Sequence, residues 1–217
     1  MIGKGVLKPS YTQRPAFFAG ILGMMAALAG TFLAMGFVGT KEAIALRLQE
    51  DLQRSLAQVL PLERYDNDPS QQPLLLPLDS GVSLTVYRGF AGAAPRGYAF
   101  EVQEPGYSGV IRVLLGLTEA GEILGVRVLS HTETPGLGDK IEAAKDDWIL
   151  GFNGRSLESL PEAQWAVKKD GGQFDQFSGA TITPRAVVRA VKRGLLMHRA
   201  NQGALAAPLK EQPEDTL

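Results

Sequence analysis

The 217-residue sequence contains no cysteine and only two histidines, His131 and His198. The missing cysteines exclude a disulfide framework, a thiolate metal site and a cysteine-ligated iron–sulfur cluster. Two histidines are too few for a histidine-rich metal site, so we predict no bound metal. The formal net charge of −1 gives no indication of nucleic-acid binding. No G-x-G-x-x-G follows a predicted strand, so the sequence predicts no NAD site of its own.

Charged residues are absent from 15–40, an apolar run of 26 residues. A helix of this length exceeds the roughly 20 residues that cross the hydrocarbon core of a membrane. The preceding segment, 1–14, carries Lys4, Lys8 and Arg14 and no acidic residue. By the positive-inside rule this basic stub stays in the cytoplasm, and the remainder of the chain lies on the other side.

A cleaved secretory signal is the alternative, because Ala27-Leu28-Ala29 is similar to a small-x-small cleavage site. The apolar run continues past this tripeptide through Val38, whereas a cleavable signal normally has a shorter apolar core. We therefore predict an uncleaved single-pass anchor. Its small residues, such as Gly23, suit the close approach of another membrane helix and are equally typical of membrane helices in general.

Beyond the anchor, the hydrophobic pattern predicts one α+β domain with a mainly antiparallel sheet and flanking helices. Leucines four residues apart, from Leu48 to Leu60, predict an amphipathic helix over 41–60, and a proline-containing connecting segment follows. Helices are predicted over Lys140–Ile149 and 184–200. Strands are predicted at Ser83–Tyr87, Gly97–Val102, Val110–Leu117 and Ile123–Leu129, with a hairpin turn at 119–122.

These patterns predict five regions along the chain. They are a cytoplasmic basic stub (1–14), a transmembrane helix (15–40), an amphipathic helix with its connecting segment (41–80), a folded domain (81–200) and a flexible tail (201–217).

The stretch 175–185 reads DQFSGATITPR and places small and hydroxyl-bearing residues before a helix. Thr183 is a good N-cap and Pro184 is favoured at the first helical position, so the predicted helix begins directly after Thr181. A helix N-terminus presents unpaired N–H groups and a partial positive charge, which favour a phosphate.

Gly179 and Ala180 are small enough for a bulky group to approach the backbone, and Thr181 brings a hydroxyl to the same place. Arg185, one turn further on, offers a positive charge. We therefore expect a phosphate beside Thr181 or bonded to it. The alternative is that Ser178–Thr181 merely precedes a capped helix, and this tetrapeptide taken alone favours the cap.

A second informative stretch, 131–140, reads HTETPGLGDK. Pro135, Gly136 and Gly138 predict a tight turn with exposed backbone amides, and this turn also leads into a predicted helix. Two small-residue loops that each precede a helix suggest two walls of one site for an anionic ligand. A plain connecting loop is the alternative.

Together the two stretches resemble the FMN-binding domain family. The first fits an Asp-x-x-Ser/Thr-Gly-Ala-Thr pattern and the second fits Glu-Thr-Pro-Gly-Leu-Gly. In that family a flavin transferase moves FMN from FAD onto the last threonine, so the resemblance implies a phosphodiester between the flavin phosphate and Thr181. The cofactor-binding residues that it implies are Thr181, Ser178, Gly179, Ala180, Asp175, Thr183, Glu133, Thr134, Gly136, Leu137, Gly138 and Lys140.

The layout of a basic stub, one membrane helix and an exported FMN domain is similar to that of the G subunits of Rnf (Rsx) ion-translocating electron transport complexes. This resemblance implies an electron-transfer subunit of the ferredoxin/NAD type, located in a bacterial inner membrane with its FMN domain in the periplasm. Its implied partners are the other membrane and peripheral subunits and the flavin transferase. It implies no catalytic residue in this chain.

Two alternatives stay open at this point. The first is the related C subunit of the sodium-pumping NADH:quinone reductase, which is usually longer. The second, from another class, is a membrane-anchored binding or scaffold module without redox chemistry. A flavin mass on the peptide that contains Thr181 separates the second alternative from the others.

Overall fold

The computed structural model describes residues 15–78, 81 and 83–208. The predicted basic stub, 1–14, and the end of the predicted tail, 209–217, lie outside the described residues. The chain divides into two units, Met1–Glu50 and Asp51–Leu217.

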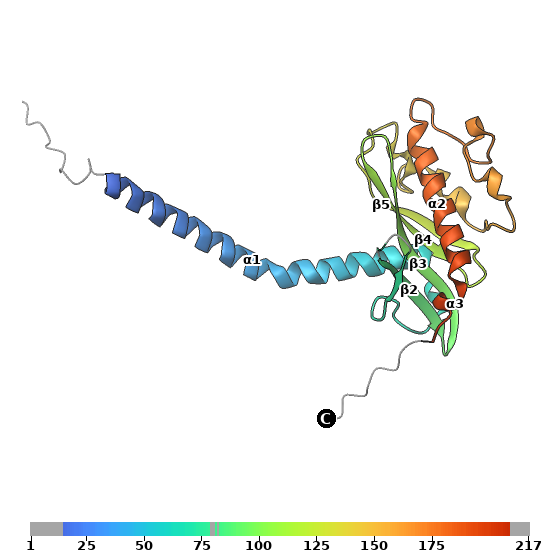
Figure 1. Cartoon of the computed structure of the whole chain (residues 1–217), viewed down its shortest axis with the longest axis horizontal. Helices are drawn as coiled ribbons and strands as arrows, with labels where there is room; N and C mark the ends of the chain where they lie inside the picture. The colour runs from blue at the N-terminus through green and yellow to red at the C-terminus, as the bar shows by residue number, and fades with distance from the viewer. Residues whose placement is uncertain (1–14, 79–80, 82, 209–217) are drawn as a thin grey trace, which may run out of the picture. The chain divides into compact units, whose positions relative to one another are not determined.

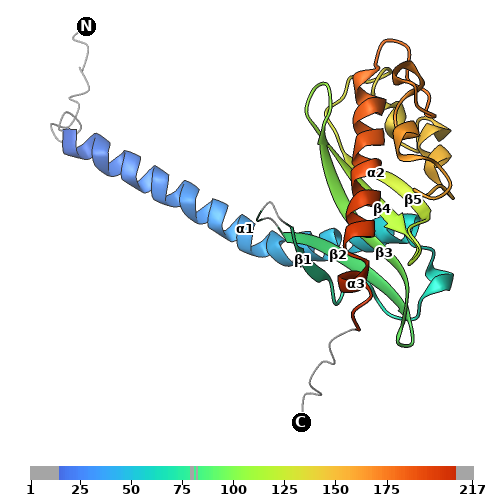
Figure 2. The same ribbon diagram turned by 45° about the vertical axis from the view of Figure 1, so that its right-hand side comes forward.

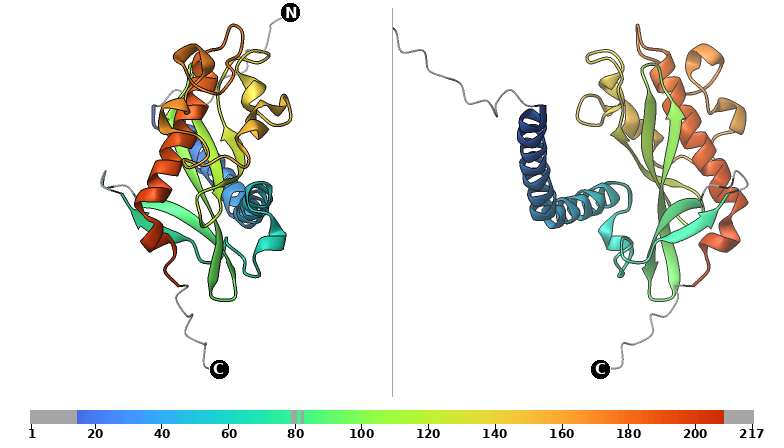
Figure 3. Two further views of the ribbon diagram at one scale, coloured as in Figure 1. Left: turned by 90° about the vertical axis from the view of Figure 1, so that its right-hand side faces the viewer. Right: turned by 60° about the vertical axis from the view of Figure 1, so that its left-hand side comes forward.

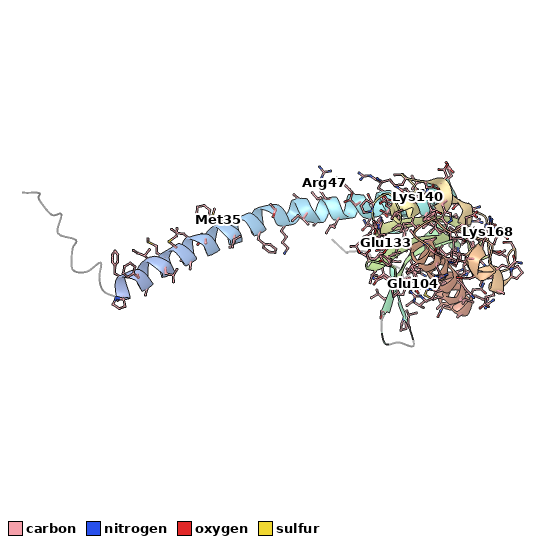
Figure 4. The ribbon with its side chains drawn as sticks, turned by 90° about the horizontal axis from the view of Figure 1, so that it is seen from above. Met35, Arg47, Glu104, Glu133, Lys140 and Lys168 are labelled. Atoms are coloured by element: carbon pink, nitrogen blue, oxygen red, sulfur yellow. The ribbon has the colours of Figure 1, made fainter. Side chains whose placement is uncertain are left out.

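Helix α1 (Pro15–Val59) contains the whole apolar run and continues through most of the predicted amphipathic helix (Figure 1). Its most apolar window has a mean hydropathy of 2.0 and is 0% buried against the rest of the chain. Figure 4 shows Met35 on this apolar part and Arg47 further along the helix. By length and composition the helix is able to cross a membrane, although a signal sequence meets the same criteria.

The second unit is built on a five-stranded antiparallel sheet in the order β1-β2-β3-β4-β5. The α+β class and the antiparallel sheet are therefore confirmed. One strand was not predicted, because β1 lies in the segment expected to be a loop or extended connection. It contributes Leu76, which is 5% exposed, to the core. The strands are β1 (Leu74–Pro77), β2 (Ser83–Ala91), β3 (Ala94–Pro105), β4 (Val110–Leu117) and β5 (Ile123–Ser130).

Helix α2 (Ile182–Ala200) lies along one face of the sheet, and the last turn of α1 meets the other face (Figure 2 and Figure 3). Side chains alternate between the two faces of a strand. Phe100 and Leu115 accordingly belong to the main core on the α2 side, whereas Ala99 and Leu114 belong to a smaller cluster with α1.

Glycines bring both helices unusually close to the sheet. A Cβ at Gly116 would lie 2.1 Å from the carbonyl oxygen of Val59 at the end of α1. On the opposite face, a Cβ at Gly194 of α2 would lie 2.5 Å from the Leu115 side chain. The sheet is thus held between α2 and the last turn of α1, and α2 is fixed where its N-terminus carries the predicted site.

The prediction of a helix over Lys140–Ile149 is wrong. Two short 3-10 helices, η3 (Asp139–Ile141) and η4 (Asp147–Phe152), replace it. The side chain of Asp146 accepts a hydrogen bond from the backbone N–H of Trp148, which starts a new turn at this point. Aspartate favours such local bonds over the interior of a helix. Further 3-10 helices are η2 (Leu62–Arg64), η5 (Glu162–Gln164) and η6 (Lys168–Asp170).

The predicted flexible tail does not begin at residue 201. Helix α3 (Gln202–Leu205) follows α2, and Leu205 is 1% exposed in the main core. The Arg88 side chain also donates a hydrogen bond to the carbonyl oxygen of Ala207 at 2.6 Å. These contacts attach the chain to the domain for several residues beyond α2.

Candidate functional site

The N-terminus of α2 forms one side of the candidate site. The helix begins at Ile182, and Thr181 occupies the N-cap position without a capping bond from its side chain. The prediction that Thr183 is the N-cap is wrong. Thr183 lies inside the first turn, is 1% exposed, and donates its hydroxyl to the carboxylate of Glu133. Within the described residues the Thr181 hydroxyl has no hydrogen-bond partner.

A tight turn presents Thr181. The N–H of Ala180 donates to the carbonyl oxygen of Phe177 at 3.2 Å, and Gly179 has φ 82°. This left-handed conformation favours glycine, because a Cβ makes it costly. Phe177 is 9% exposed and packs against Trp148, with ring centroids 5.2 Å apart. The turn is therefore fixed to the core at its first residue, while Ser178 and Gly179 are exposed.

The loop 133–138 forms the opposite wall. The backbone N–H groups of Leu137 and Gly138 both donate to the carbonyl oxygen of Thr134, at 3.2 and 2.9 Å. Gly136 has φ 77°, which closes the predicted tight turn. A Cβ at Gly138 would lie 2.8 Å from that of Glu133 and 3.1 Å from the Thr183 hydroxyl, so only glycine fits there.

Glu133, labelled in Figure 4, connects three segments of the chain. Its side chain is 4% exposed. One carboxylate oxygen accepts the backbone N–H groups of Tyr107 and Ser108, each at 3.0 Å, and the other accepts the Thr183 hydroxyl. Buried carboxylates require such hydrogen bonds. Glu133 therefore holds together the β3–β4 turn, its own loop and the first turn of α2.

These three segments enclose a cavity of about 440 Å³. This volume lies in the range of small-molecule binding sites. The two small-residue stretches singled out in the sequence thus meet at one place, although about forty residues separate them. The cavity is lined by Tyr107, Glu133, Thr134, Leu137, Gly138, Gly179, Ala180, Thr181, Ile182 and Thr183.

Eight of the twelve predicted site residues line the cavity, and Asp175, Ser178, Gly136 and Lys140 do not. The Asp175 carboxylate is 67% exposed and pairs with the Lys168 ammonium at 2.6 Å. Ser178, Gly136 and Lys140 are exposed. Contact of any of the twelve with a cofactor stays a prediction.

Arg185, expected to offer charge to a phosphate, is engaged elsewhere. Its guanidinium donates two hydrogen bonds to the Asp170 carboxylate, at 2.6 and 2.8 Å. The same contact lowers the pKa of Asp170 and raises that of Arg185. A bidentate pair of this kind directs the guanidinium toward the carboxylate.

Two lining residues were not predicted, Tyr107 and Ile182. Tyr107 is 70% exposed in the β3–β4 turn, and Ile182 is 42% exposed at the start of α2. Gly106 and Gly109 mark this turn in the sequence. Nothing in their spacing shows that the turn meets Glu133, which is 26 residues later than Tyr107.

His131 precedes the loop in the sequence and does not line the cavity. Its Nδ1 accepts the backbone N–H of Glu133 at 3.1 Å, and its Nε2 lies 2.8 Å from the Glu142 carboxylate. The first bond requires an unprotonated Nδ1, so Nε2 carries the proton toward Glu142. His131 thus supports the backbone that carries Glu133.

Comparison with known proteins shows the family to which this chain belongs. The model of the FMN-binding domain matches residues 106–196, a range that contains every lining residue. The G subunit of the ion-translocating oxidoreductase complex of Cereibacter sphaeroides is 51% identical over 190 residues, covering 87% of this chain and 86% of that one. This chain belongs to the G-subunit family of ion-translocating oxidoreductase complexes.

Another G subunit of such a complex, from Shewanella loihica, is 44% identical and covers 86% of this chain and 91% of its own length. The crystal structure of Shewanella oneidensis NqrC has 21% identity and a TM-score of 0.46, covering 68% of this chain and 71% of that one. The identity to G-subunit sequences favours this family over the C subunit of the quinone reductase, which the sequence had left open.

The G-subunit cavity has features that fit FMN. Tyr107, Leu137 and Ile182 expose apolar surface, which suits a planar ring. The first turn of α2 leaves the N–H groups of Ile182 and Thr183 without partners inside the helix, and such groups bind phosphate oxygens. The Thr181 hydroxyl beside them has no hydrogen-bond partner among the described residues.

Proposed function

We propose that Thr181 carries FMN through a phosphodiester bond, and that the chain serves as the electron-transfer subunit of an ion-translocating oxidoreductase complex. The observation that carries the proposal is the position of the Thr181 hydroxyl. It lies at the N-terminus of α2, lines a cavity of about 440 Å³, and has no partner among the described residues. A structural N-cap would instead use its hydroxyl to accept a backbone N–H.

The covalent bond needs a flavin transferase and FAD. The Thr181 oxygen forms a bond to the phosphorus of the FMN half, the bond between the two phosphates of FAD breaks, and AMP leaves. The hydroxyl proton of Thr181 passes to a base of the transferase or to solvent. The segment that precedes Thr181 in the sequence has exposed residues, Asp175, Ser178 and Gly179, and is therefore accessible to a modifying enzyme.

Residues of this chain then have separate roles. The N–H groups of Ile182 and Thr183 bind phosphate oxygens, and Leu137 and Tyr107 offer apolar contact to the ring. When bound, FMN supplies the transfer of single electrons between redox partners. Outside the cytoplasm, FMN that dissociates is not replaced from the cytosolic supply. A covalent tether prevents this loss of the cofactor.

We also propose the topology. Residues 15–40 form an uncleaved anchor in the inner membrane, the basic stub stays in the cytoplasm, and the folded domain that follows lies in the periplasm among the other subunits. The support is the charge asymmetry of the sequence and the length and hydropathy of α1.

The test is the intact mass of the full chain after expression with the flavin transferase. We expect wild type to gain the mass of FMN less one water and Thr181→Val to gain none. Thr132→Val is the matched control, since it removes an exposed threonine outside the lining and should still be modified. An unmodified wild type, with a transferase that modifies a control substrate, would exclude the proposal.

A further inference from the structure

The cavity lacks the charges of an ordinary phosphate site. No lysine, arginine or histidine is among the ten described residues that line it. Proteins that bind free phosphate esters commonly use such cations, because they pair with the phosphate oxygens. The only carboxylate on the lining belongs to Glu133, which is 4% exposed.

Nearby cations are occupied or lie outside the lining. Arg185 is paired with Asp170 at 2.6 Å, and Lys168 is paired with Asp175 at 2.6 Å. Lys140 lies on η3 and is exposed. The attraction for a phosphate therefore rests on the N-terminus of α2, which supplies only a partial charge.

Glu133 opposes that attraction. Its three hydrogen-bond donors are two backbone N–H groups and one hydroxyl, none of which neutralises its charge. Through Thr183 the carboxylate is bonded directly to the first turn of α2, where a phosphate would lie. A free phosphate monoester carries a charge of about −1.5 to −2 at neutral pH. A phosphodiester carries a single negative charge, so Glu133 repels it less.

We infer that the cavity retains FMN only as the phosphodiester on Thr181, and that Glu133 discriminates against free FMN and other phosphate monoesters. The inference rests on the proposed function. The covalent bond takes the place of the ion pairs that a noncovalent site requires. The same charge pattern keeps soluble phosphate monoesters from occupying the cavity before the transferase acts.

The test compares free FMN with riboflavin, which has the same ring and ribityl chain but no phosphate. Both are titrated into the full-length Thr181→Val chain, produced without the transferase, by calorimetry or flavin fluorescence. We expect FMN to bind no tighter than riboflavin. Binding of FMN at least about tenfold tighter than riboflavin would overturn the inference, since it would reveal a working phosphate site.

Two further variants, made in the Thr181→Val background, test whether Glu133 and the lack of cations in the lining account for the weak binding of FMN. Glu133→Gln keeps an acceptor for the two backbone N–H groups and should raise the affinity for FMN about five- to tenfold, with riboflavin unchanged. Thr134→Lys adds a cation to the lining and should favour FMN over riboflavin. Thr132→Lys, on an exposed residue outside the lining, is the matched control and should not.

An FMN-to-riboflavin ratio that Glu133→Gln leaves unchanged would overturn the role of Glu133, provided that circular dichroism shows the variant folded. If that variant does not fold, the test is the comparison of Thr134→Lys with Thr132→Lys. Equal FMN affinities of these two variants would overturn the inference. Failure of the proposed function is a separate result, because it appears as an unmodified mass of wild type with an active transferase.

Discussion

The hydroxyl of Thr183 donates a hydrogen bond to the carboxylate of Glu133, fifty residues earlier in the chain. The same carboxylate accepts the backbone N–H groups of Tyr107 and Ser108. One side chain thereby fixes the relative positions of three segments that border the cavity. The shape of the site depends on a small number of bonds, and each of them is open to mutation.

The first prediction concerns Thr183. Thr183→Val keeps the shape of the side chain but leaves one oxygen of the buried Glu133 carboxylate without its donor. We expect the free energy of unfolding to fall by about 1–3 kcal/mol, the cost of an unsatisfied buried polar group. Urea unfolding of the full chain in detergent measures it. Thr183→Ser keeps the hydroxyl and is the control; equal stability of the two variants would show that the bond contributes nothing.

The second prediction concerns the approach of α1 to the sheet. A Cβ at Gly116 would lie 2.1 Å from the backbone oxygen of Val59, which cannot rotate away as a side chain does. We expect Gly116→Ala to lower the free energy of unfolding by at least about 2 kcal/mol, because the last turn of α1 has to shift.

Gly151→Ala is the matched control for this change, since nothing lies within 4 Å of a Cβ at Gly151. Its effect on urea unfolding should be small. A Gly116→Ala protein as stable as the Gly151→Ala protein would show that α1 is not held against β4 in solution.

The third prediction concerns pH. His198 is 2% exposed, its Nε2 has no hydrogen-bond partner among the described residues, and burial lowers its pKa below 6.5. Between the lowered value and 6.5, the unfolded chain binds a proton that the folded chain does not. The contribution of His198 to stability is therefore complete above about pH 6.5 and is lost as the pH falls below it.

Titration of His198 alone changes the free energy of unfolding by at most about 1.4 kcal/mol per pH unit. The comparison is the free energy of unfolding of wild type and His198→Gln between about pH 7 and pH 5. We expect their difference to change over this range, because the glutamine does not titrate. A constant difference would mean that His198 titrates normally in the folded chain.

Local patterns were sufficient to predict much of this fold. Alternating apolar residues gave the location of β2 to β5, and the valines and leucines of 184–200 gave the buried face of α2. The two small-residue loops were also visible, because Gly136 and Gly179 mark left-handed turns. Each of these signals depends on residues that are neighbours in the sequence.

The errors have a common physical origin. Thr183 has the local signature of an N-cap, but its hydroxyl partner, Glu133, is fifty residues away in the sequence. The place of Tyr107 in the cavity is hidden in the same way, because only the folded chain brings its turn to the loop. The prediction of a helix over Lys140–Ile149 is wrong because the side chain of Asp146 accepts a hydrogen bond from the backbone N–H of Trp148. Tertiary contacts and local side-chain bonds both overrule helical spacing.

The last prediction tests the membrane topology, and the absence of cysteine makes the test simple. Any introduced cysteine is the only thiol in the chain. Ala163→Cys places it on an exposed residue of η5, away from the cavity, and Ser10→Cys places it in the basic stub. A membrane-impermeant maleimide is added to cells with a permeabilised outer membrane.

We expect the Ala163→Cys protein to react in these cells and the Ser10→Cys protein to react only after the inner membrane is disrupted. The reverse pattern would contradict the positive-inside assignment made from Lys4, Lys8 and Arg14. The mass of the mature chain separates the anchor from a cleaved signal. A protein that begins at Gly30, after Ala27-Leu28-Ala29, would have lost more than half of the apolar run and with it the span that holds the domain at the membrane.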